Sequence, residues 1–160
     1  MPDEYGKIFG KYEGVVSNTS DPLKGGRLEV LIPRIHGTEK IWAMPCSPYA
    51  TDGLGFLMLP PKDSKVWVEF MEGDRNKPIW SGCYWSNGRV PSLDPDEMVI
   101  ATPKAKISMT SKTSDLLIEI KNGAKITING KTIKIDNGAQ ATIELDGSTT
   151  KINGNGIEVN

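Results

Sequence analysis

The last third of the chain, from Leu116 to Asn160, carries a repeat that restricts how it can fold. Pairs of aliphatic residues separated by one residue recur along it, as at Ile118 and Ile120 or at Ile133 and Ile135. Asn-Gly or Asp-Gly dipeptides fall between the pairs, at 122–123, 129–130, 137–138, 146–147, 153–154 and 155–156. Alternation of apolar and polar residues is the period of a β-strand, and these dipeptides supply the positive φ of tight turns. The repeat therefore predicts a succession of short strands.

Burial is the difficulty for such a tract. Each predicted strand has only two or three aliphatic side chains on one face, while Lys, Glu, Thr and Asp occupy the other. A narrow single sheet hides little apolar surface and is marginally stable alone. The aliphatic face must therefore pack on something else, and the simplest partner is a copy of itself. For the strands themselves, a simple antiparallel meander with Asn-Gly hairpins is the local alternative to pairing between chains.

Composition divides the chain into two parts. Every aromatic residue lies between Tyr5 and Trp85, and the aliphatic repeat follows them. Between the two parts, residues 86–96 contain Asn-Gly and two prolines, which interrupt regular structure. We therefore predict a barrel domain at 1–85, a linker with the first strands of a shaft at 86–106, and the shaft itself at 107–160.

Alternating residues predict strands in the first part as well, and no run there has the 3.6-residue period of a helix. The predicted strands cover residues 11–16, 27–32, 41–46, 65–70 and 78–85. Residues 53–61 fit either a strand or a loop that dips into the core. Short strands with Gly and Pro at the corners favour a small closed barrel, so the predicted fold class is all-β.

The charge balance argues against two classes of partner. With 19 basic and 20 acidic residues the net charge is −1, so no overall field attracts nucleic acid or an anionic membrane. No signal peptide is visible, and no apolar run reaches the ~20 residues of a membrane span. We expect synthesis in a reducing cytoplasm. Cys46 and Cys83 lie in apolar, strand-like contexts, which favours buried free thiols, with a single disulfide as the alternative.

Two local patterns in the first part resemble one known family. The run from Gly26 to Pro33, followed by His36-Gly37, is similar to a stretch in the OB-type barrel of central spike proteins of contractile phage tails and related injection systems. The run from Phe70 to Gly82 resembles the hairpin of the same barrel. The positions that carry the resemblance are Gly26, Arg27, Pro33, His36, Gly37, Gly73, Asp74, Pro78 and Gly82. In that family an aliphatic repeat follows the barrel and winds into a β-helical prism.

The resemblance implies a homotrimer in which this chain and two further copies form an intertwined triple-stranded β-helix. Backbone groups would then pair between chains as well as within them. The side chains implied to face the trimer axis are Ile118, Ile120, Ile126, Ile128, Ile133, Ile135, Ile143, Leu145 and Ile152. The implied function is that of a structural spike, which docks at a tail tube or hub protein and transmits force to pierce the target cell envelope. Its place would be a virion tail baseplate or an extracellular injection particle, which touches the target membrane only on piercing.

Many members of the family end in a histidine-ligated metal tip, and this chain has no histidine after His36. The resemblance therefore implies a blunt end covered by a separate tip protein of the proline-alanine-alanine-arginine repeat type. The residues expected to dock that protein are Ile157, Glu158, Val159 and Asn160. Two exposed aliphatic residues per chain at a free end would otherwise form an apolar patch.

The residues argue against an enzyme and against any cofactor or metal. His36 has no second histidine or cysteine near it in the sequence and is expected to be a loop residue. No Gly-x-Ser-x-Gly, Walker or dinucleotide motif is present. The competing function is that of an OB-fold module that binds single-stranded nucleic acid or a glycan. Its candidate rings sit in alternating strands, so we expect most of them in the core: Tyr12, Trp42, Tyr49, Trp67, Trp80 and Trp85.

Overall fold

The computed structural model describes residues 6–153, which divide between two units, residues 1–88 and residues 89–160. Strands dominate both units, and the helical elements of the described residues are the single turn α1 (Pro33–His36) and the 3₁₀ turn η1 (Met71–Gly73). No helix in residues 6–153 combines the length and the apolar character that crossing a membrane would require.

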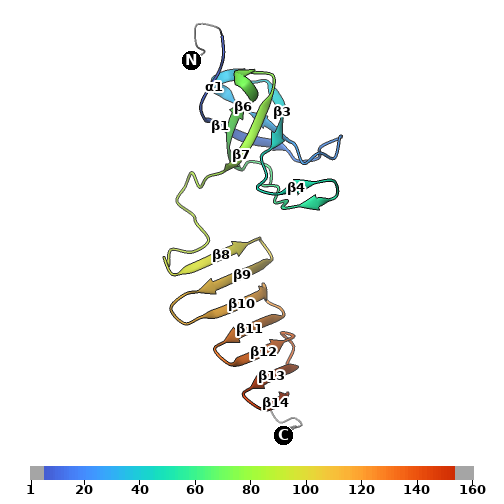
Figure 1. The fold of residues 1–160 in the computed structure, drawn as a ribbon, viewed down its shortest axis with the longest axis vertical. Helices are drawn as coiled ribbons and strands as arrows, with labels where there is room; N and C mark the ends of the chain where they lie inside the picture. Colours follow the sequence, from blue (N-terminus) through green and yellow to red (C-terminus); the bar gives the residue numbers. More distant parts are fainter. Residues whose placement is uncertain (1–5, 154–160) are drawn as a thin grey trace. The chain divides into compact units, whose positions relative to one another are not determined.

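The first unit contains a closed barrel, seen in the upper part of Figure 1. Its strands follow the order β1-β2-β3-β7-β6, and β6 pairs with β1 to close it. All pairs are antiparallel except β3 with β7. The strands are β1 (Tyr12–Asn18), β2 (Leu28–Leu31), β3 (Lys40–Pro45), β6 (Lys65–Phe70) and β7 (Pro78–Cys83). The sequence predicted this closed barrel.

Alternation along these strands builds the core of the barrel. In β6, for example, Val66, Val68 and Phe70 are buried while the residues between them face outward. The other buried apolar side chains come from the remaining strands and from the segment before β1: Ile8, Tyr12, Val16, Leu28, Val30, Ile32, Ala43 and Trp80. The core therefore mixes β-branched side chains with a few rings, as expected for a small closed barrel.

Three details of the barrel unit differ from the prediction. Residues 33–36 form α1, which is too short to produce a helical period, and Pro33 stands at its start where no donor N–H is required. Cys46 and Cys83 are free and exposed, because each lies where its strand leaves the barrel wall. Residues 53–61 do not enter the core. They include one strand of a projecting hairpin, formed by β4 (Ala50–Thr51) and β5 (Leu54–Gly55).

The second unit is a seven-stranded antiparallel sheet whose order, β14-β13-β12-β11-β10-β9-β8, is simply the order of the chain. Figure 1 shows it as a ladder from β8 to β14. Its strands are β8 (Glu97–Ala101), β9 (Ala105–Thr110), β10 (Asp115–Ile120), β11 (Lys125–Asn129), β12 (Thr132–Asp136), β13 (Thr142–Asp146) and β14 (Thr149–Ile152). The predicted turn residues make the corners: Asn122, Gly130, Gly138 and Gly147 all have φ between 56° and 73°.

The pairing of these strands is that of the meander alternative. Each strand from β9 to β13 has a hydrogen-bonded neighbour from the same chain on both sides. These inner strands therefore have no free edge for the ladders between chains that the resemblance implied. The apolar side chains on one face of the sheet, in contrast, are not covered by another described element of the chain.

Candidate functional site: the aliphatic face of the C-terminal sheet

One line of isoleucines crosses the whole sheet. In an antiparallel pair, residues directly opposite each other lie on the same face. The strand registers place seven residues in one such line, one from each strand: Ile100, Ile107, Ile118, Ile126, Ile135, Ile143 and Ile152. The antiparallel register therefore turns the sequence repeat into a continuous apolar row.

A second row lies beside the first on the same face, two residues away along each strand. It consists of Met98, Met109, Leu116, Ile128, Ile133, Leu145 and Thr150. Ile120 extends the face further on β10, opposite Ala105. The two rows together with Ile120 are called the aliphatic face below. Thr150, on the last described strand, is the polar member of the second row.

The aliphatic face is open in the single chain. Twelve of its members are exposed, with exposed fractions from 37% at Ile126 and Ile133 to 57% at Met98. Leu116 and Ile128, in the middle of the sheet, are half-buried. Contiguous apolar surface of this extent marks an interaction site, and a single sheet layer needs such a cover for stability.

The opposite face of the sheet is charged and internally balanced. Basic and acidic residues alternate from strand to strand in two lines, Lys106-Glu119-Lys125-Asp136 and Lys134-Glu144-Lys151. Lys151 Nζ lies 3.3 Å from Glu144 Oε1 in an ion pair. Opposite charges across neighbouring strands favour this register and keep the face in water. The sheet therefore has one face suited to solvent and one suited to an apolar partner.

All nine residues predicted for a trimer axis lie on the aliphatic face. The prediction did not include five further apolar members: Met98, Ile100, Ile107, Met109 and Leu116. Met98-x-Ile100 and Ile107-x-Met109 have the same spacing as the later pairs and could have revealed them. The turn between these two pairs is Thr-Pro-Lys rather than Asn-Gly, and Thr102 Oγ1 closes it by accepting from Ala105 N at 2.9 Å. The residues predicted to dock a tip protein, Ile157 to Asn160, lie outside the described residues.

The motif residues of the barrel serve its corners. Gly26 and Arg27 come just before β2. Pro33 and His36 lie in α1, and Gly37 follows it; Gly73 and Asp74 are at the end of η1. Pro78 and Gly82 lie in β7. Gly73 shows why its residue type is required: its φ is +75° and a Cβ there would lie 3.0 Å from Lys7 Cβ and 3.2 Å from Ile8 N. These residues shape the barrel rather than gather into one site.

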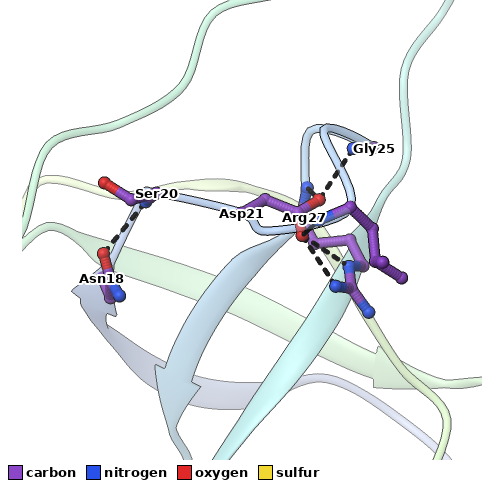
Figure 2. A network of polar contacts seen from close by, with 6 residues as sticks. Asn18, Ser20, Asp21, Gly25 and Arg27 are labelled. Carbon is purple, nitrogen blue, oxygen red and sulfur yellow. Dashed lines mark hydrogen bonds and ion pairs between the residues drawn. The ribbon is translucent and has the colours of Figure 1, made fainter.

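A buried ion pair organises the loop between β1 and β2 (Figure 2). Asp21 Oδ1 accepts hydrogen bonds from Arg27 Nη2 at 2.7 Å and from Arg27 Nε at 3.0 Å. The same carboxylate accepts backbone N–H groups of Leu23, Gly25 and Arg27. The Arg27 guanidinium, followed by these backbone groups, holds the pKa of Asp21 well below its usual range. Arg27 also covers the Trp42 ring, with its Cζ 5.3 Å from the ring centroid.

Two polar groups in the barrel unit contain residue types that occur in catalytic sites: the Lys11–Glu69–Ser81 cluster and His36. Lys11 Nζ pairs with Glu69 and lies 3.0 Å from Ser81 Oγ, which in turn donates to Glu69 Oε1 at 3.1 Å. Lys11, then Ser81, lowers the pKa of Glu69. A lysine ammonium paired with a carboxylate has no lone pair to take the serine proton, so this cluster supplies no activated nucleophile.

His36 is the other candidate, and it ends α1 rather than lying in a loop. Its ring meets Phe70 edge-on with centroids 6.0 Å apart, and burial, together with nearby Arg75, lowers its pKa. Within residues 6–153, no three His, Cys, Asp or Glu side chains come together as a metal site.

Most of the six aromatic rings that could form a nucleic-acid platform lie outside the core. The prediction that most of them would be core residues was therefore wrong. Tyr12 and Trp80 belong to the core. The rings outside it are Trp42 and Trp67, which are half-buried on the outer wall, and Tyr49 and Trp85, which are exposed. In β3 and β6 an outward position also holds a ring, Trp42 and Trp67 respectively, which apolar–polar alternation alone does not reveal.

Comparison with protein families accounts for both units. Residues 12–85 match the type VI secretion system/phage-baseplate injector OB domain. Residues 97–158 match the phage baseplate V C-terminal trimerisation domain, a range that contains every strand of the aliphatic face. A search of curated proteins gave no match.

The two matched families cover most of the chain and are structural domains of baseplates and spikes rather than enzymes. The trimerisation domain makes the protein a homotrimer, as predicted. Its family implies assembly into a virion or an extracellular particle. The chain therefore belongs to the phage baseplate V family and is a spike-type structural protein of a baseplate or injection system.

Proposed function

We propose that this protein is the central spike of a contractile tail or injection machine and transmits force to pierce the target envelope. The observation that carries the proposal is the aliphatic face, which runs unbroken over seven strands of a homotrimeric protein. Three such faces packed about one axis would give a shaft with a dry interior and a charged exterior. Its members, including the nine predicted axis residues, would then point to the threefold axis.

The direction of the hydrogen bonds suits a part that carries load. Successive strands of the sheet follow one another along the shaft, so their backbone hydrogen bonds lie along its length. At about 4.8 Å per strand, seven strands span roughly 30 Å. Thrust along the shaft would therefore press on a continuous ladder of backbone contacts.

The ends of the spike would have different partners. The barrels would dock beneath the tail tube or hub protein, and Ile157 to Asn160 would hold a separate tip protein. Support for this assignment comes from Ile157 and Val159, two aliphatic residues that a tip protein would cover.

Complementation in the producing bacterium tests the proposal. Particles made without this protein should fail to penetrate target cells, and the wild-type gene should restore penetration. Ile135→Asp should not restore it, whereas Lys134→Ser, a change on the charged face of the same strand, should. Penetration by particles that lack the protein would overturn the proposed function.

Removal of residues 154–160 tests the tip assignment separately. The shortened protein should still form trimers and enter particles, and electron microscopy of those particles should show no density beyond the end of the shaft. Unchanged tip density would exclude these residues as the docking site.

A further inference from the structure

The barrel unit has an apolar surface of its own, on the hairpin of β4 and β5. The hairpin projects from the barrel wall (Figure 1). We call residues 49–59 the arm. Its large apolar side chains are 37–67% exposed: Tyr49, Leu54, Phe56, Leu57, Met58 and Leu59. So many exposed apolar side chains in one short segment mark a contact site rather than ordinary surface.

The arm is held in a fixed shape. Ser47 Oγ lies 3.0 Å from Tyr49 O and 2.9 Å from Phe56 O, so one hydroxyl ties the two ends of the hairpin together. Phe56 N donates to Tyr49 O at 2.9 Å. Gly55 permits this approach, because a Cβ there would lie 2.7 Å from Tyr49 O. A surface ordered before contact loses little entropy on binding.

The chemistry of the arm calls for an apolar partner. Asp52, at the hairpin turn, is the one charged residue in the sequence from 49 to 59. Between the arm and the barrel lies a hollow of about 510 Å³ whose lining includes Gly26, Pro45, Leu57 and Trp80. Neither surface presents the cluster of cations that a nucleic acid requires.

The outer wall of the same barrel carries a matching aromatic surface. Trp67 of β6 stacks on Tyr84 with ring centroids 4.5 Å apart, and Trp85, the next residue in the chain, is 64% exposed. We call these three residues the aromatic wall. After the arm, the chain re-enters the barrel at Lys65, the first residue of β6. Tyr84 N donates a hydrogen bond to Lys65 O, so the aromatic wall lies at this same end of the barrel. Arm and wall are therefore at the same end of the barrel unit.

We propose that the arm of each barrel packs on the aromatic wall of the neighbouring copy in the homotrimer. A cyclic trimer joins two unlike surfaces of each subunit, and the arm and the wall are such a pair. Residues 84–96, which connect β7 to β8, reach at most about 45 Å, so the trimerisation domains keep three barrels near one another. That tether gives a high effective concentration to a contact too small to hold alone. The proposal rests on the homotrimer and is independent of force transmission.

Photo-crosslinking in the purified full-length trimer tests this contact. Leu57→p-benzoylphenylalanine should give covalent dimers and trimers on a denaturing gel after irradiation. Mass spectrometry should locate the crosslinks at Trp67, Tyr84 or Trp85 of the partner subunit. Lys77→p-benzoylphenylalanine, at an exposed turn before β7, should give no such products.

A second-site variant and the pattern of crosslinks test whether the arm contacts the aromatic wall of the neighbouring copy. Adding Trp85→Ala to the Leu57 variant should remove most of the covalent trimer while native mass spectrometry still shows three chains, because the C-terminal sheets hold the assembly. The proposal is overturned if the intact trimer gives crosslinks only within a chain, or none until the protein enters an assembled particle. The second result would assign the arm to the hub.

Discussion

At the scale of single residues, Asp21 shows how one carboxylate can hold a loop that has no secondary structure of its own. Its side chain is 4% exposed, and that of Arg27 is 18% exposed. Three backbone N–H groups between β1 and β2 donate hydrogen bonds to its carboxylate. The family resemblance pointed to Arg27 but not to its partner, because a lone Asp in a turn-rich segment has no distinguishing pattern.

Asp21→Asn should destabilise the barrel at neutral pH, since the amide loses the ion pair and the charged acceptor. A carboxyl with a depressed pKa contributes stability above its unfolded pKa of about 4 and loses it as the pH falls through the folded value. The gap between the urea midpoints of wild type and variant should therefore narrow below about pH 4. Asp52→Asn, in the exposed turn of the arm, is the control and should leave the midpoint unchanged. A gap that stays constant with pH would count against the ion pair as its source.

At the scale of elements, the sequence predicted strands better than it predicted how they pair. The apolar pairs and Asn-Gly turns give the strands and corners from β10 onward, because period and turn chemistry are local properties. Which edges pair, and whether within one chain, depends on partners that a local pattern does not contain. The arm was also missed, since its apolar residues look like core residues in the sequence and their exposure follows from the tertiary structure.

The aliphatic face gives a prediction with an internal control. Ile135→Asp should convert the trimer to monomers or aggregates, because three carboxylates would be brought together in an apolar interior. Lys134→Ser lies on the opposite face of β12 and should keep the trimer. Analytical ultracentrifugation measures both. A stable Ile135→Asp trimer would remove this residue from the axis.

Two glycines at turns of the sheet should respond differently to the same change. A Cβ on Gly138 would lie 2.7 Å from the carbonyl carbon of Gly123, so Gly138→Ala must push apart two stacked turns. Gly130 also has a positive φ, but open space surrounds it. We expect Gly130→Ala to cost about 1 kcal/mol for the backbone conformation alone and Gly138→Ala to cost more. Equal losses in chemical denaturation would show that the turn stacking contributes nothing.

At the scale of the whole molecule, trimerisation and barrel folding are assigned to different parts of the chain. A fragment ending at Gly88 should fold, because its core is complete, and should be monomeric, because the aliphatic face is absent. Circular dichroism and sedimentation would check this, with the full-length trimer as reference. A fragment that trimerises at micromolar concentration would show that the barrels associate without the shaft.

Self-association was inferable from the sequence for a physical reason, because a narrow sheet with one aliphatic face is marginally stable alone. The number of three copies came from the family resemblance. The full extent of the aliphatic face was not predicted, because the repeat was taken to begin at Leu116, after Met98 and Met109. Similarly, Cys46 was expected inside on the strength of its apolar neighbours, although β3 ends at Pro45. Local hydrophobicity predicts where a strand lies, but the residue at which the strand ends decides which side chains are left outside the core.

The pairing of each C-terminal strand with its neighbour in sequence has a consequence for biogenesis. Contacts between strands adjacent in the chain have low contact order, and their formation needs no long loop to close. The strands of one nascent chain can therefore pair in register without another copy, but the sheet becomes stable only when its aliphatic face is covered. The rate at which three copies meet then rises with the number of chains made close together. Translation of several copies from one messenger RNA would favour correct partners before an open apolar sheet meets anything else.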